Sequence, residues 1–216
     1  MVFSFLTAVC LAFGFGGVDM SASFANTKGL DARLTALDRE WDSTSTGTFR
    51  TTSPLWWLGG HGGGHVGLLT VGGRGAVMTR NAKVDGLAAE MFGVNGFFDI
   101  GFPYAPVEQF WVRPCLELGG GTWVHYIHSD ESFSQPDFSR WYLAWTFGML
   151  PGAEVMGRIR YMGDNYVGLF VKGGYFVPFS GPGWSGDAEP PKLGLSGFAL
   201  QFGLRFGKLE QKSFRL

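Results

Sequence analysis

Residues 109–128 read QFWVRPCLELGGGTWVHYIH, and the two faces of this stretch differ in chemistry. Every second residue from Phe110 to Tyr126 belongs to a face that is almost wholly apolar, while the other face carries Arg113, Glu117 and two glycines. Successive side chains of a strand point to opposite faces, so this period of two predicts a β-strand with one apolar face. Twenty residues extend roughly 65 Å at about 3.3 Å per residue, far beyond the usual 5–6 residues of a soluble strand.

The same alternation recurs in residues 92–102, 167–177 and 198–206, where large apolar residues share one face and glycines and charges share the other. The alternation alone does not say which face is inside. Strand length, strand number and composition must decide that question.

The composition favours a protein whose surface faces lipid. Only 16% of the 216 residues are charged, against an average of about 25%. Glycine contributes 35 residues and aromatic residues 16% of the chain, which suits a barrel with small luminal and aromatic interfacial residues. The net charge of −1 gives no basic excess, so nucleic acid is not an expected partner. After the N-terminus no apolar run reaches the roughly 20 residues of a membrane helix.

Eight segments share the strand pattern, and they predict an all-β fold: one antiparallel up-and-down β-barrel domain over residues 1–216. An even number of strands lets such a sheet close without a bare edge, and eight strands leave room for side chains but for no wide pore. The expected strands are residues 3–22, 54–61, 66–79, 86–102, 108–128, 139–160, 166–178 and 196–208, with 209–216 as a short tail. A turn is expected at 61–65, a second at 102–106 and a loop at 180–196.

Two N-terminal segments allow more than one interpretation. Residues 1–25 form either the first barrel strand, with Phe15 among its large residues, or a signal peptide with Ser23-Phe24-Ala25 as a small-residue cleavage site. Residues 28–42 change to a helical period and predict a short amphipathic helix. This helix covers a barrel mouth, enters the lumen or lies on the surface of a long loop.

The polar faces of the strands carry a set of charges that we expect to line the lumen. Buried charges need partners, so in a narrow barrel they would form a salt-bridged core that blocks conduction; a selective ion path is the alternative. The network is expected to contain Arg74, Asp99, Arg113, Glu117, Glu154, Arg158, Lys172 and Arg205, with Asn95, Arg160 and Gln201 on the same faces.

Other candidate constellations are weaker. His61 and His65 flank glycines and His125 and His128 lie on opposite faces of a strand, so neither pair supplies the three or four ligands of a zinc site. The glycine run 59–64 precedes a strand rather than a helix, which argues against a phosphate loop. We therefore expect no metal and no cofactor. Cys10 and Cys115 are either two buried thiols or a luminal bridge.

The last strand carries Gln201, Gly203 and Phe206 in the order polar residue, glycine, alternating hydrophobics. Here the chain resembles small bacterial outer-membrane barrels of the OmpA/OmpX-like, eight-stranded kind. The segments 116–121, 173–179 and 197–207 are similar to a glycine-rich barrel family of Gram-negative-type bacteria. The resemblance implies an outer-membrane location, lipid as surroundings, recognition of Gln201, Gly203 and Phe206 by the barrel-assembly machinery, and a monomer.

Three functions follow from these observations. The first is an integral outer-membrane barrel with a polar, plugged interior and a structural or surface-interaction role, without enzymatic activity. The second is a soluble or periplasmic lipocalin-like barrel whose Phe-rich face lines a cavity for an apolar ligand. The third is an outer-membrane lipid hydrolase, for which His125, His128, Ser129, Asp130 and Glu131 supply the residue types.

Overall fold

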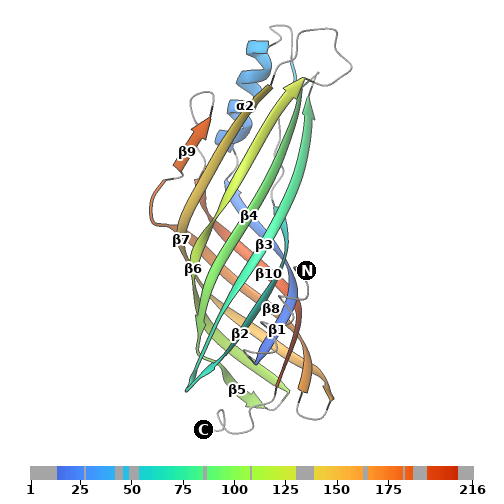
Figure 1. The fold of residues 1–216 in the computed structure, drawn as a ribbon, viewed down its shortest axis with the longest axis vertical. Helices are drawn as coiled ribbons and strands as arrows, with labels where there is room; N and C mark the ends of the chain where they lie inside the picture. Colours follow the sequence, from blue (N-terminus) through green and yellow to red (C-terminus); the bar gives the residue numbers. More distant parts are fainter. Residues whose placement is uncertain are drawn as a thin grey trace.

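A computed structural model describes residues 14–26, 28–41, 46–48, 54–84, 87–107, 109–129, 139–162, 165–181, 183–186 and 194–208. These residues form a closed antiparallel barrel with one helix (Figure 1). In chain order the elements are β1 (Phe15–Asn26), α2 (Lys28–Trp41), β2 (Leu55–Val66), β3 (Leu69–Val84), β4 (Leu87–Gly101), β5 (Tyr104–Val107), β6 (Phe110–Ser129), β7 (Ser139–Met162), β8 (Asn165–Pro178), β9 (Gly183–Gly186) and β10 (Gly194–Lys208).

Eight of the described strands close the barrel. The order β6–β4–β3–β2–β1–β10–β8–β7 returns to its start because β6 also pairs with β7. The first and last strands pair from Phe15 with Gly207 to Ala25 with Gly197, which completes the ring. Two short strands are additions, since β5 pairs with the beginning of β6 and β9 with β7. The predicted eight-stranded, all-β barrel is confirmed.

Two predicted strand boundaries are wrong. The first strand, described from Phe15, ends at Asn26 rather than at residue 22, and residues 3–13 of the predicted segment lie outside the described residues. Phe15 is buried, because its ring lies 4.8 Å beneath the guanidinium of Arg205 inside the barrel. Residues 23–26 belong to this strand, so cleavage after Ala25 would remove the strand that closes the barrel.

The predicted turn at 61–65 is also wrong, because β2 continues to Val66 and the chain turns at Gly67 and Leu68. The glycines allow close approach of β2 and β3 rather than a turn: a Cβ on Gly63 would overlap the carbonyl oxygen of Val71. Two short strands also occur where none was predicted: β5 overlaps the predicted turn at 102–106, and β9 lies within the predicted loop at 180–196.

The outer surface of the barrel is apolar. On β6, Leu116 is exposed while Arg113 and Glu117 are buried, so the apolar face of the organising stretch points outward. Every strand of the ring contributes exposed large hydrophobic residues, for example Val18, Trp56, Val77, Phe92, Val124, Phe147, Leu169 and Phe202. The lipocalin-like alternative required the Phe-rich face to line the cavity, and this placement contradicts it.

The interior changes from charged to apolar along the barrel. Near α2 the inward side chains are apolar, and Leu34 and Leu37 of the helix pack against them. This apolar cluster contains Leu34, Leu37, Leu55, Trp57, Ala76, Met78, Leu87, Met91, Ile127 and Tyr142. The predicted helix is therefore present at the end of the barrel opposite β5 (Figure 1), with its leucines against the inner wall. Among the described residues no helix has the length and apolar character to cross a membrane.

Candidate functional site: the luminal charge network

Every strand of the ring sends at least one polar side chain into the lumen on the side of the barrel away from α2. Each points inward because it occupies the parity opposite the exposed apolar residues of its strand. We name this set the luminal charge network: Asp19 (β1), His61 (β2), Arg74 (β3), Asp99 (β4), Arg113 and Glu117 (β6), Glu154 (β7), Lys172 (β8) and Arg205 (β10).

Arg113 stands at the centre of the network. Its Nη1 and Nη2 donate to the two carboxylate oxygens of Asp99 at 2.6 and 3.0 Å, the bidentate geometry that an arginine fork favours. Nη2 also donates to Glu154 at 2.9 Å, and Nη1 to the hydroxyl of Thr70 at 3.0 Å. One cation therefore connects strands β3, β4 and β7 through the lumen.

Arg205 joins the last strand to the first. Its two terminal nitrogens donate to the carboxylate of Glu154 at 2.5 and 2.8 Å, and its Nε donates to His61 Nε2 at 3.1 Å. Because Nε2 accepts, the imidazole proton resides on Nδ1, which lies 3.0 Å from Asp19 Oδ2 and donates to it. The rings of Phe15, Trp111 and Phe170 surround the guanidinium at 4.8 to 5.6 Å.

Lys172 connects the remaining carboxylates. Its ammonium donates to Asp99 at 2.7 Å and to Glu117 at 2.6 Å. Arg74 approaches the same Glu117 oxygen more distantly, with Nε at 3.5 Å, and its guanidinium lies 4.9 Å from the centre of the Phe97 ring.

The charges of this network balance. Four carboxylates face four cations, and His61 is neutral in the tautomer that its contacts define. Mutual pairing of this kind is what makes buried charges tolerable in a low-dielectric interior. The space left among them is about 20 Å³, enough for about one water molecule. The arrangement therefore holds strands together and contains no activated nucleophile among its described members.

Seven of the eight side chains that the sequence placed in a luminal network contact one another in this way. The eighth, Arg158, lies 5.0 Å from the ring of Tyr166 instead, next to the irregularity in the β7–β8 pairing. Asp19 and His61 are not among the predicted members, because the sequence pattern groups Asp19 with the face of Phe15 and places His61 in a turn. The alternation of Asp19 with Val18 and Met20 was the available signal.

The other sequence candidates lie apart from the network or at its edge. Gln201 is buried and Phe206 exposed on β10, and a Cβ on Gly203 would overlap the carbonyl oxygen of Val18. Their role as an assembly signal stays a prediction. Cys115 is buried, whereas Cys10 lies outside the described residues.

The residue types of the lipid hydrolase hypothesis are not gathered where they are described. His125 is buried on the inward face, while His128 stacks on Tyr126 and places its Nδ1 3.1 Å from the Ser129 carbonyl oxygen. Asp130 and Glu131 lie outside the described residues. The described part of the chain also contains no group of three metal-binding side chains.

The ring of eight strands, the apolar outer surface and the charged lumen define the class of small up-and-down barrels. No family model matches the chain, and no curated protein sequence matches it. Among solved structures the chain is similar to Ail, the attachment invasion locus protein of Yersinia pestis, with a TM-score of 0.37 and 11% identity over 91% of this chain and 98% of that chain. A likeness at this level says nothing about what either protein binds.

Proposed function

We propose that this protein is an integral outer-membrane barrel with a plugged polar interior and a structural or surface-interaction role. The observation that carries the proposal is the apolar outer surface, to which all eight ring strands contribute while the charged side chains of the network point inward. A soluble monomer rarely exposes an apolar surface larger than a few hundred Å². In hydrocarbon the same surface is favourable, and a closed ring satisfies the backbone polar groups that lipid cannot.

The connections support one orientation. At the end near β5, two residues separate β2 from β3 and two separate β7 from β8. The connection from β4 to β6 at this end has eight residues and includes β5. At the other end two residues separate β3 from β4, but the remaining three connections are longer: residues 27–54 including α2, 130–138 and 179–193. Outer-membrane barrels have short periplasmic turns and long extracellular loops, so the α2 end faces outward from the cell.

The long strands support a role at the cell surface. β7 has 24 residues and β6 has 20, whereas about 9–11 residues of a tilted strand cross the hydrocarbon core. Strands of this length project beyond the hydrocarbon core, and β6 and β7 extend to the end of the barrel where α2 lies (Figure 1). The projecting wall and the helix packed against it are available to molecules outside the cell.

The network supports a lumen that does not conduct. Its members are buried and paired across the barrel, and an eight-stranded barrel leaves an interior that side chains can fill. Lipid and the barrel-assembly machinery are the partners of this proposal, with Gln201, Gly203 and Phe206 as the assembly signal.

Gel mobility of detergent-extracted protein, with and without boiling, tests the membrane barrel. We expect the protein in the carbonate-washed membrane fraction and a shift on boiling, because a closed barrel resists unfolding by detergent alone. A soluble protein with no shift would overturn the proposal.

Cysteine labelling tests which face meets lipid, in a background with Cys10→Ser and Cys115→Ser. A cysteine at Leu169, which is exposed on β8, should resist a water-soluble maleimide in membranes and react after unfolding. A cysteine at Val66, next to the β2–β3 turn, is the matched accessible control. Equal labelling of both in intact membranes would contradict a lipid-facing wall.

A further inference from the structure

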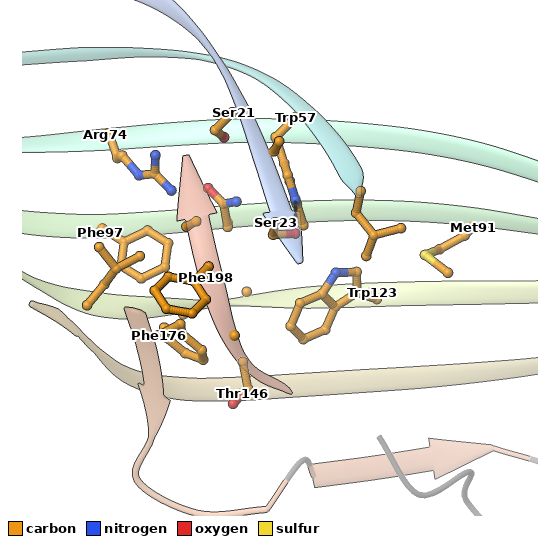
Figure 2. Close-up of a pocket in the computed structure, with 18 of the residues that line it drawn as sticks. Ser21, Ser23, Trp57, Arg74, Met91, Phe97, Trp123, Thr146, Phe176 and Phe198 are labelled. Atoms are coloured by element: carbon orange, nitrogen blue, oxygen red, sulfur yellow. Dashed lines mark hydrogen bonds between the residues drawn. The ribbon is translucent and has the colours of Figure 1, made fainter. Parts of the chain in front are cut away.

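A second internal space lies between the luminal charge network and the apolar cluster that receives α2. This cavity has a volume of about 90 Å³ and is lined mainly by apolar side chains. Figure 2 shows Arg74 and Phe97 at one end of it and Met91 at the other. Phe198 and Ala199 of β10 belong to its lining.

Arg74, the most distantly paired cation of the luminal charge network, borders this cavity. Its side chain is 8% exposed, and its single ion pair within the described structure is the 3.5 Å approach of Nε to Glu117. That carboxylate is already held by Lys172 at 2.6 Å. Its Nε is buried without a hydrogen-bond partner among the described residues, and no hydrogen bond from its two terminal nitrogens is found within them. A buried guanidinium with free donors requires an explanation, because buried charges ordinarily have close partners.

Three more polar atoms in the lining lack a hydrogen-bond partner among the described residues. They are the hydroxyls of Ser21 and Thr146 and the amide oxygen of Asn95. Ser21 and Thr146 are almost completely buried, so bulk water does not satisfy them. Either hydroxyl can donate its proton to an acceptor inside the cavity.

The walls between these polar groups are aromatic and fixed in place. Trp57 and Trp123 meet edge to face with ring centres 6.3 Å apart, and Trp57 Nε1 donates to Ser23 at 3.1 Å. Phe97 and Phe176 form a second edge-to-face pair at 6.1 Å. The cavity thus combines an apolar body with a single cation at one end.

From this combination we propose that the cavity binds a small monocarboxylate with a short apolar body. The carboxylate pairs with the free Nη donors of Arg74, whose planar fork matches two carboxylate oxygens. The apolar body lies among Trp57, Trp123 and Phe176. An apolar cavity of about 150 Å³ admits benzene. The cavity described here is smaller, so we expect it to bind ligands that have fewer heavy atoms than benzene.

The test uses fluoroacetate as the probe, because it has fewer heavy atoms than benzene, and fluorine NMR of the full-length barrel in detergent micelles as the readout. The matched neutral probe is 2-fluoroethanol, which has the same fluoromethyl body without the charge. We expect a protein-bound resonance for the carboxylate, and an affinity for the alcohol at least about tenfold weaker, as loss of one charge-assisted hydrogen bond implies. No bound resonance for the carboxylate, or equal affinity for both probes, overturns the proposal.

Two variants locate the bound carboxylate. Arg74→Gln should weaken its binding by about tenfold or more, and Ala199→Leu, which fills the lining on β10, should abolish it. Leu200→Met, on the outward face of the same strand, is the control and should leave binding unchanged. Since Ala199 lies outside the network, Ala199→Leu decides the matter if Arg74→Gln does not fold. Unchanged binding in Ala199→Leu, or equal competition by chloride, overturns the proposal.

The proposal of a membrane barrel and the proposal of this ligand site can be rejected independently of each other. The boiling shift of each NMR sample reports a closed barrel, whatever the probe does. A sample that shifts on boiling but binds no probe therefore rejects the carboxylate site and leaves the membrane barrel standing.

Discussion

Glu154 shows how much one luminal side chain holds together. Both oxygens of its carboxylate accept from Arg205, and one also accepts from Arg113, so strands β6, β7 and β10 meet at this residue. Neither arginine can lose its charge, and neither reaches water from the buried lumen. The main role of the Glu154 carboxylate is therefore to compensate the charges of the two buried arginines.

Glu154→Gln should lower the free energy of unfolding by about 3–5 kcal/mol, because it leaves two buried guanidinium groups undercompensated. The measurement is the fraction of protein with folded mobility on unheated gels across a denaturant series. Glu90→Gln is the control, since the Glu90 side chain is 55% exposed and 3.8 Å from His128. That pair should contribute less than about 1 kcal/mol. Equal denaturation midpoints for the two variants would contradict the expected contribution of the luminal charge network to stability.

For single residues, the sequence predicted which face of a strand a side chain occupies better than it predicted which side chain it contacts. The alternation along β6 was enough to group Arg113 with Glu117, because parity is a property of one strand. Which carboxylate each cation meets depends on the register between strands and on the curvature of the ring. The role of Thr70 as an acceptor for Arg113 had no local signal for the same reason.

Among the elements, β6 and β7 form the longest pairing of the ring, from Phe110 with Gly157 to His128 with Ser139. In the middle of this pairing the two backbones approach closely at Gly120. A Cβ there would overlap the carbonyl oxygen of Thr146, which is backbone and cannot move aside alone. The glycine is required by this close approach.

Gly120→Ala should therefore reduce the yield of folded barrel severely, whereas Gly173→Ala should not. A Cβ on Gly173 in β8 meets no atom within 4 Å, which makes it the matched control. The yield of heat-modifiable protein after refolding into detergent measures both variants. Similar yields would show that β6 and β7 can separate at Gly120 without cost.

The helix α2 depends on its two buried leucines. Leu34→Asp with Leu37→Asp should release the helix from the inner wall, because each buried leucine contributes about 2–5 kcal/mol to such a contact. Brief trypsin treatment should then cleave at Arg33 or Arg39, while the barrel keeps its shift on boiling. Ala32→Ser, at an exposed position, is the control. Trypsin resistance equal to that of the control would contradict packing of α2 in the barrel mouth.

The helix could be predicted because its period differs from that of the strands around it. The boundaries of β1 and β2 could not, for two physical reasons. Phe15 alternates with small residues whether its face is inside or outside, and the glycines at 62–64 fit a turn as well as a close strand pairing. The orientation of Phe15 and the conformation of the glycines are determined only by pairing with the neighbouring strands.

For the whole molecule, the fold class followed from the number and length of the alternating segments. Alternation did not show which face points inward. The exposure of Phe202 and Leu169 shows that the Phe-rich faces of their strands point outward and do not line the lumen. The balanced charge of the lumen is likewise a property of the assembled ring. No single strand carries it.

The proposed plug makes a prediction about current. In planar bilayers the protein should show no steady conductance, because buried ion pairs link side chains across the lumen. The double variant Glu154→Ala with Arg205→Ala removes one carboxylate and one cation, so it keeps the charge balance and should give measurable openings. Steady current from the unaltered protein, or silence from the double variant, would contradict the plug as described.

The contacts of Arg205 also bear on how the barrel is made. The last strand brings the cation that compensates Glu154 and completes the chain from His61 to Asp19 on the first strand. Until that strand arrives, Glu154 has only Arg113 as a partner and His61 has only Asp19. The open edges of β1 and β8 add unpaired backbone. Closure therefore satisfies backbone and lumen in one step. Assembly should be all-or-none, with partly closed rings too costly to accumulate.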